Sequence, residues 1–222
     1  MMAGMSLMAY WPLAGLRVRT PRLELRIPDS AELGVLARLA AAGVHDPAVQ
    51  PFAVPWTDAE PEERARRVLR WHWRCWADWR VDEWTLNFVV LRDGEVVGSQ
   101  AISAKDFSIC SEVHTGSWLG SAHHGRGIGT EMRAAVLELA FARLGAGSAV
   151  SAAFEDNLGS QGVSRKLGYE HDGLAMHAVR GKPAVMRRLR LTRVRWEAHR
   201  SIPVKVAGLE ECLPLFGVPP AS

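Results

Sequence analysis

A glycine-rich loop between a predicted strand and a predicted helix constrains the fold of this chain more than any other feature. Residues 123–141, HHGRGIGTEMRAAVLELAF, carry glycines at three alternate positions, Gly125, Gly127 and Gly129. The preceding VHTGSWLG has the composition of a strand, and an amphipathic helix is predicted from about Thr130. Alternate glycines leave backbone N–H groups unshielded, and a helix N-terminus adds further unpaired N–H groups and a positive dipole end. The loop therefore predicts a phosphate-binding site.

The spacing of the glycines excludes two common phosphate sites. A dinucleotide-binding loop has the pattern G-x-G-x-x-G, whereas here the third glycine comes one residue early and Thr130 occupies its place. A nucleoside-triphosphate loop needs Gly-Lys followed by Ser or Thr, and neither Gly127 nor Gly129 precedes a lysine.

The remaining pattern, (Arg/Gln)-x-x-G-x-(G/A) between a strand and a helix, resembles the GCN5-related N-acetyltransferases (GNAT superfamily). The chain matches it at every position except the first, where His124 replaces arginine or glutamine. The resemblance implies that the backbone amides of this loop hold the pyrophosphate of coenzyme A. The implied residues are His124, Gly125, Arg126, Gly127, Ile128, Gly129 and Thr130.

Two further blocks extend the resemblance. RTPRLELR, residues 19–26, resembles the first strand of the RimJ/RimL-like branch, and EDNLGSQGVSRKLGYEHDG, residues 155–173, resembles the last conserved block of the superfamily. The phrases GVHDP, PFAVPWT and GSWLG are similar to those of an actinobacterial group for which succinyl-CoA is a plausible donor. The resemblance thus implies acetyl-CoA or succinyl-CoA as co-substrate.

Hydrophobic periodicity and turn residues predict a mixed α/β domain. The sheet is expected to be mostly antiparallel, with one central parallel pair joined by a helical crossover and with helices on both faces. The strands are expected at 23–27, 84–90, 96–103, 112–119, 149–154, 172–179 and 184–191, and the helices at about 30–42, 60–80, 130–144 and 158–167.

Residues 1–191 are expected to form one acyltransferase domain, with 1–16 as an N-terminal lead-in. Residues 192–222 form an extension that packs either on the same domain or on a second protomer, so a homo-oligomer is one expectation. Residues 1–16 lack the basic start and the cleavage site of a signal peptide, and no apolar run approaches the roughly 20 residues of a membrane span. We therefore expect a soluble protein without membrane partners.

Composition favours a cytoplasmic enzyme over a nucleic-acid binder. The net charge is only +3, and six arginines near the end of the chain (187, 188, 190, 193, 195 and 200) are expected to form a solvated face. Three widely spaced cysteines fit neither a disulfide framework nor a zinc cluster, so we expect a reducing compartment and no metal.

The resemblance also assigns contacts to the pantetheine arm of CoA. Strands 112–119 and 149–154 are expected to diverge beside the glycine loop, which leaves backbone groups of the first strand free to pair with the arm. The implied residues there are Trp118, Leu119 and Gly120, with Asn157 and Ser160 on the other side. Asn157 has an alternative role as a helix N-cap, and the two roles are compatible.

Catalysis requires a neutral amine to attack the thioester. Glu112 and His114, two residues apart on one strand, face the same side of the sheet, and one of them is expected to accept the amine proton. Many relatives place a tyrosine acid where this chain has Ser164. Either Ser164 or water protonates the leaving group, or CoA departs as thiolate, for which a thiol pKa of about 8.5 is suitable.

The acceptor pocket is expected around the loop at residues 44–58. His45, Asp46, Trp56 and Gln100 are candidates for polar contacts among aromatic walls, with ordinary loop structure as the alternative for each. A succinyl donor would require an arginine, a lysine or several N–H donors near its free carboxylate.

The leading hypothesis is an acyl-CoA-dependent N-acyltransferase that acts on a primary amine in a ternary complex. The acceptor is a protein N-terminus, a lysine or a small molecule such as an aminoglycoside. The alternative from another class is a non-catalytic module that binds or senses acyl-CoA, which fits the missing tyrosine and the departure at His124.

Overall fold

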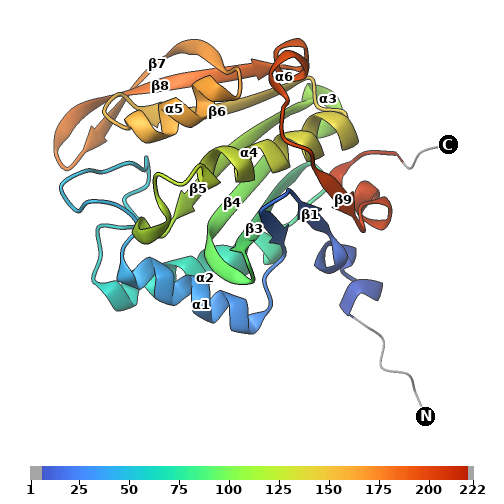
Figure 1. Ribbon diagram of the computed structural model, residues 1–222, viewed down its shortest axis with the longest axis horizontal. Coiled ribbons are helices and arrows are strands. Elements are labelled where there is room, and N and C mark those ends of the chain that lie inside the picture. Colours follow the sequence, from blue (N-terminus) through green and yellow to red (C-terminus); the bar gives the residue numbers. More distant parts are fainter. Residues whose placement is uncertain (1–6, 220–222) are drawn as a thin grey trace.

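A nine-stranded sheet runs through residues 7–219, the part of the chain that the computed structural model describes (Figure 1). The strand order is β7-β8-β6-β5-β4-β3-β2-β1-β9, and every neighbouring pair is antiparallel except β5 and β6. The strands are β1 (Arg17–Arg19), β2 (Leu23–Arg26), β3 (Glu83–Arg92), β4 (Glu95–Lys105), β5 (Glu112–Leu119), β6 (Ser148–Phe154), β7 (Glu170–Val179), β8 (Lys182–Thr192) and β9 (Lys205–Ala207).

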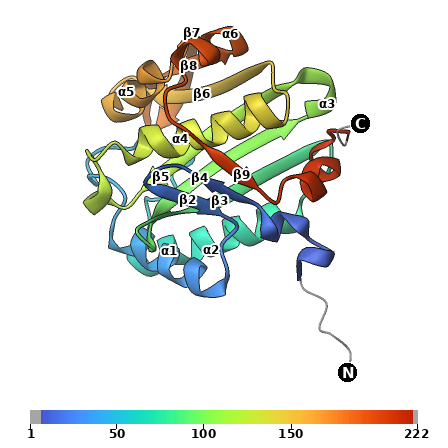
Figure 2. The same ribbon diagram turned by 45° about the vertical axis from the view of Figure 1, so that its right-hand side comes forward.

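Helices cover both faces of the sheet (Figure 2). The helices α1 (Ser30–Ala42) and α2 (Pro61–Ala77) pack on β3 and β4 from one side, and α4 (Ile128–Glu138) packs on the other. The shorter helices are α3 (Phe107–Cys110), α5 (Leu158–Lys166) and α6 (Arg193–His199). The predicted fold class is therefore confirmed, including the single parallel pair with α4 in its crossover.

The parallel pair separates soon after it begins. β5 and β6 are in register only from Glu112 opposite Ser148 to His114 opposite Val150. On its other side, β5 stays paired with β4 as far as Leu119. The segment Thr115–Leu119, which we call the open edge, therefore has a strand neighbour on one side only. The two strands form a V whose mouth is next to the glycine loop, residues 124–130.

Local sequence signals fix the ends of the main helices. Asp29 caps α1 in a reciprocal box with Glu32, as the predicted N-terminus requires. α4 begins at Ile128, two residues earlier than predicted, because Gly127 in a left-handed conformation serves as its N-cap. It continues as one π-helical turn, Leu139–Arg143, before the chain enters β6.

The C-terminal extension packs on its own chain. β9 pairs with β1 at the edge of the sheet, and the 3₁₀ helix Glu210–Phe216 buries Cys212 and Phe216 in the main core. In the N-terminal lead-in, Leu13 and Leu16 join the same core, while residues 1–6 of the predicted lead-in lie outside the described residues.

The tryptophans of α2 do not define its buried face. Helical spacing assigns Leu69, Trp73 and Trp76 to the core, but the side chain of Trp73 is 52% exposed. The buried residues are instead Val68, His72 and Cys75, which follow one another at intervals of four and three. Helical spacing alone does not orient this helix, because large apolar residues lie on several of its faces.

The burial of His72 predicts a loss of stability in weak acid. Burial lowers the pKa of His72 to about 4, below the usual 6.5. Between these values the unfolded chain binds a proton that the folded protein does not, so stability falls as the pH drops below 6.5. From pH 7 to pH 5 this contribution is about 2 kcal/mol. Urea unfolding at both pH values should show this loss, and His72→Leu should reduce it by about that amount; an equal loss in both proteins would refute the prediction.

Candidate acyl-CoA site

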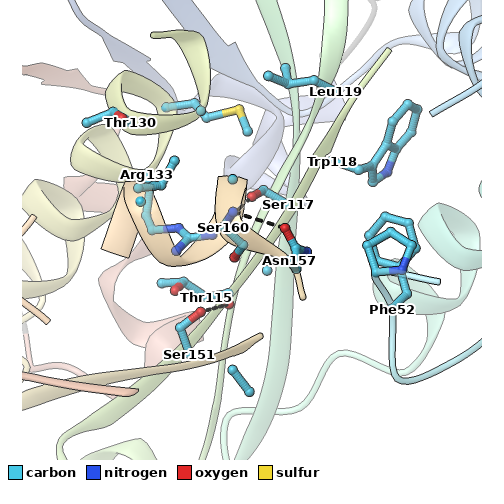
Figure 3. A pocket seen from close by; sticks show the side chains of 18 of the residues that line it. Phe52, Thr115, Ser117, Trp118, Leu119, Thr130, Arg133, Ser151, Asn157 and Ser160 are labelled. Carbon is cyan, nitrogen blue, oxygen red and sulfur yellow. Dashed lines mark hydrogen bonds between the residues drawn. The ribbon is translucent and has the colours of Figure 1, made fainter. Parts of the chain in front are cut away.

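The glycine loop forms one wall of a cavity of about 930 Å³ at the mouth of the V (Figure 3). Gly125 and Gly127 have φ of 73° and 76°, in the left-handed region that favours glycine. Both glycines line the cavity, together with Ile128, Gly129 and Thr130 at the N-terminus of α4. The loop therefore presents backbone N–H groups and the positive helix end to the cavity, as an anion site requires.

A buried acid fixes the start of α4 to the first part of the sheet. Glu131, which is 4% exposed, accepts hydrogen bonds from the Thr20 hydroxyl (2.6 Å), the Arg22 backbone N–H (3.1 Å) and Arg22 Nε (2.6 Å). Arg22 also donates to the carbonyl of Arg126 within the loop (3.2 Å). Neither Arg22 nor Glu131 was predicted to have a role in the site, and together they tie the glycine loop to the start of β2.

His124 lines the cavity and also bonds to the end of β5. Its Nε2 lies 3.1 Å from the carbonyl oxygen of Leu119. The bond ties the loop to the end of β5. The backbone of the loop keeps its anion-binding geometry although arginine or glutamine is absent at this position.

The open edge differs in detail from the predicted pantetheine contacts. Gly120 donates its N–H to Val97 on β4 (3.1 Å), so its donor faces away from the V. Because backbone groups alternate along a strand, Trp118 also points its groups toward β4, while Ser117 and Leu119 point theirs into the V. The Leu119 N–H faces the V while its carbonyl already accepts a bond from His124, so the contact of Leu119 with the arm stays a prediction. Trp118 and Gly120 were wrong as backbone donors. Sequence alone does not show which residues of the strand point their backbone groups toward β4 and which point them into the V.

Asn157 and Ser160 lie on the opposite side of the cavity, at the start of α5. The Asn157 side-chain oxygen accepts the Ser160 backbone N–H (3.0 Å), so Asn157 is an N-cap. The Ser160 hydroxyl and the Asn157 amide remain on the cavity wall (Figure 3).

Glu112 and His114 both line the cavity on the side away from α4. Glu112 forms an ion pair with Arg190 and accepts a hydrogen bond from Ser148 (2.8 Å). Burial alone would raise the pKa of Glu112, but the hydrogen bonds from Arg190 and Ser148 outweigh it and hold the pKa below its usual range. His114 is exposed to the cavity. A carboxylate held in this way is a weak base, so His114 is the better proton acceptor of the two.

Arg133, on the second turn of α4, lies between Ser164 and the cavity. Its Nη1 donates to the Ser164 hydroxyl at 2.9 Å, and its Nη2 lies 3.5 Å from the Ser117 hydroxyl. Arg133 lines the cavity whereas Ser164, 1% exposed, does not. Ser164 was therefore wrong as a group that reaches the substrate. Sequence reasoning missed Arg133, whose only signal was a charged residue beside the apolar stripe of α4.

Three of the four predicted acceptor residues, Asp46, Trp56 and Gln100, do not line the cavity. Asp46 is an exposed turn residue whose carboxylate accepts the Ala48 N–H (2.9 Å). Gln100 is fully buried in β4 and donates to the carbonyl of Gly116 (3.0 Å), so both predictions were wrong. Asp46 stabilises a turn and Gln100 bonds to the neighbouring strand instead.

His45 and Phe52 of the loop at 44–58 lie on the side of the cavity where the acceptor is predicted to bind. His45 and Phe52 line it, and His45 is held by the Thr57 hydroxyl (2.8 Å). Trp56 lies behind them, with its ring centroid 5.2 Å from that of Phe52 and 5.5 Å from that of Trp118. It supports the wall without lining it.

An ion pair joins this loop to the β7–β8 hairpin. Arg180, at the hairpin turn, binds Asp58 through two hydrogen bonds of 3.0 and 2.7 Å and also contacts the Ala48 carbonyl. We expect Arg180→Ala to increase the rate of chymotrypsin cleavage within residues 44–58 about threefold, because an exposed bidentate pair contributes modestly. Lys182→Ala, on the same hairpin, is the control. An unchanged cleavage rate in Arg180→Ala would show that the pair does not hold the loop.

The arginine-rich end of the chain is largely neutralised. Arg187, Arg190, Arg195 and Arg200 form ion pairs with acidic residues. Among residues 7–219 no cluster of His, Cys, Asp or Glu could hold a metal ion, and no helix is long and apolar enough to cross a membrane.

Comparison with known proteins agrees with this geometry. Residues 22–170 match the family model described as an acetyltransferase (GNAT) domain. Among similar solved structures is Mycobacterium smegmatis RimJ in complex with CoA-disulfide, with a TM-score of 0.67, 19% identity, and coverage of 86% of this chain and 97% of that chain. A RimL ribosomal L7/L12 alpha-N-protein acetyltransferase in complex with CoA has a TM-score of 0.62, 20% identity, and coverage of 78% and 95%. A putative ribosomal-protein-serine acetyltransferase from Vibrio cholerae has a TM-score of 0.60, 20% identity, and coverage of 79% and 97%.

Proposed function

Because the chain belongs to the GNAT acetyltransferase family, we propose that it transfers an acetyl or succinyl group from CoA to a primary amine, by direct attack in a ternary complex. The observation that carries this proposal is the V between β5 and β6, which opens directly onto the glycine loop. An extended pantetheine arm would pair with the open edge as an added strand, while the loop and the start of α4 hold the pyrophosphate.

His114 is the proposed general base, with Glu112 as its charged neighbour. Both lie on the acceptor side of the sheet, on which an amine would meet the thioester. An amine with the pKa of lysine must lose a proton at a cost of about 4–5 kcal/mol at pH 7, so a base at this position has a large effect.

The choice between acetyl and succinyl donors is proposed to depend on Arg188. It is exposed on β8, lines the cavity on the same side as His114, and forms no ion pair with a described residue. A free carboxylate on the acyl group would find its counter-ion there. The acceptor is proposed to be a protein N-terminus, a lysine or a small amine. The free thiols of the three cysteines fit a reducing, cytoplasmic compartment.

The first experiment compares thermal stability with saturating CoA, acetyl-CoA, succinyl-CoA and NAD. A ligand at about 100 times its Kd stabilises the folded state by about 2.7 kcal/mol. Stabilisation by a CoA ester but not by NAD supports the proposal, and absence of any shift contradicts it. The better ester then enters an amine screen that detects CoA release. Binding without release for any amine would favour the alternative function, a non-catalytic acyl-CoA-binding module.

We expect replacement of Glu112 and His114 together by glutamine to lower turnover at least tenfold, with unchanged affinity for the donor, since the pair accepts the amine proton. His114→Gln alone should produce most of this loss. His171→Gln, an exposed histidine on β7 outside the cavity, is the control. Steady-state turnover with the amine found in the screen measures the effect, and full activity of the double variant would exclude both residues as bases.

A further inference from the structure

Arg133 is a buried cation without a counter-ion at the side of the V. It is 4% exposed, and its Nε has no hydrogen-bond partner. Among the described residues no carboxylate pairs with it, and its side chain donates instead to the neutral hydroxyls of Ser164 and Ser117. Burial lowers the pKa of Arg133, but arginine has so high a pKa that the guanidinium keeps its charge. An arginine buried in this way is costly unless an anion occupies the adjacent cavity.

The contacts of Arg133 place that anion away from the glycine loop. Its guanidinium reaches Ser117, in the middle of the open edge, and Ser164 on α5. The glycine loop follows the C-terminal end of the open edge, after Leu119. The pyrophosphate of CoA therefore has its own site, and Arg133 faces the part of the ligand that lies deeper in the V.

Two other anionic groups could face Arg133, the CoA thiolate and the free carboxylate of a succinyl group. The side of the sheet on which each would lie distinguishes them. Ser117 contacts Arg133 of α4, whereas Trp118, the next residue on β5, contacts Trp56 of the acceptor loop. Figure 3 shows Arg133 and Ser117 on one side of β5 and Trp118 and Phe52 on the other. The acyl group must face the acceptor side, where His114 and Arg188 line the cavity. Arg133 instead faces the side of the leaving group.

We propose that Arg133 stabilises the CoA thiolate as it leaves, a catalytic role in which a permanent cation replaces a proton donor. This inference rests on the proposed acyl transfer. In that reaction a bond forms between the amine nitrogen and the carbonyl carbon, and the carbon–sulfur bond breaks with its electron pair on sulfur. The amine proton passes to His114, and Arg133 remains protonated while its charge opposes the charge that develops on sulfur.

The roles of the two serines follow from this arrangement. Ser164 and Ser117 accept hydrogen bonds from the two Nη groups, which fixes the plane of the guanidinium before the ligand arrives. They are positioning residues. Ser164 is small enough to leave room for the arginine, at the position where the resemblance expects a tyrosine.

The test is the pKa of the CoA thiol bound to the protein. The difference in ultraviolet absorbance between the CoA complex and the desulfo-CoA complex, titrated across the pH range, reports thiolate formation. In the unmodified protein we expect the bound thiol to titrate at least one unit below free CoA. In Arg133→Met the shift should disappear, and turnover with saturating substrates should fall at least tenfold. Arg133→Gln provides a second variant if the first does not fold.

Arg165→Gln removes the same charge from an exposed neighbouring position on α5 and should leave the thiol pKa unchanged. Equal thiol pKa values in Arg133→Met and the unmodified protein would overturn the inference. In Arg133→Met, a larger loss of affinity for CoA than for pantetheine would identify a phosphate contact. A larger loss of affinity for succinyl-CoA than for acetyl-CoA would identify a carboxylate contact. Either result, with an unchanged thiol pKa, would also overturn the inference. Failure of the unmodified protein to bind CoA would refute the proposed function itself.

Discussion

Replacing Gly127 with valine is expected to weaken CoA binding at least 100-fold. Gly127 has φ of 76° and is the N-cap of α4, a conformation that a β-branched residue adopts only with strain of about 1–3 kcal/mol. A Cβ at this position would lie 3.4 Å from Arg22 Nη2, an ordinary van der Waals contact, so the expected effect comes from the backbone strain. We expect the loop to relieve this strain by changing its conformation, so that its N–H groups no longer point together at the pyrophosphate. A loss of 100-fold corresponds to about 2.7 kcal/mol.

Gly145→Val provides a matched control for backbone strain. Gly145 has φ of 80° and is exposed beyond the end of α4, outside the cavity. A Cβ added at Gly145 would meet no other atom within 4 Å, so the substitution introduces strain without a clash. Both variants should lose stability, while only Gly127→Val should lose affinity for CoA in calorimetric titration. If the two variants bind CoA equally well, the glycine loop is not the phosphate site.

The site features that sequence predicted are those that depend on local pattern. The strand, the glycine loop and the helix are contiguous, so residues 112–141 alone were enough to predict their order and the loop between them. The cap at Asn157 likewise depends on residues three positions apart. Such signals need no knowledge of what packs on the other side of the sheet.

The features that sequence did not predict depend on tertiary contacts. Arg133 was missed because an arginine beside the apolar stripe of a helix is normally solvated, and its burial results from α5 and β5 packing around it. Gln100 was assigned to the wrong place because β4 is buried on both faces for most of its length, which removes the alternation that would show its orientation. Pairing with β4 determines which backbone groups of the open edge point into the V. It therefore also determines that Ser117 points its groups into the V and Trp118 does not.

For the C-terminal extension, sequence likewise predicts the elements but not what they pack against. Its elements were predictable, since Thr192 caps α6 and residues 205–207 have the alternation of a strand. Whether they would pack on the same chain was open, because an edge strand can pair with either copy. In the structure β9 pairs with β1 of its own chain, and the following helix closes the core beside Trp79 and Trp84.

Phe216→Ala is accordingly expected to destabilise the domain by about 3–5 kcal/mol, the usual cost of removing a large aromatic side chain from a core. Phe216 is fully buried, and its ring centroid lies 4.9 Å from that of Trp84 and 5.5 Å from that of Trp79. Trp79 also donates its indole N–H to the carbonyl of Leu215 (3.1 Å), so the cavity left by alanine would disturb a hydrogen bond as well.

Urea unfolding of Phe216→Ala against Glu210→Ala, an exposed residue on the same 3₁₀ helix, measures this cost. The midpoint should fall for Phe216→Ala and stay unchanged for the control. Because the extension packs on its own chain, both midpoints should also be independent of protein concentration, whereas an extension shared between protomers would make them rise with concentration. Midpoints that rise with concentration would mean that the extension is exchanged between copies in solution, and a small effect of Phe216→Ala at every concentration would mean that its ring does not close the core.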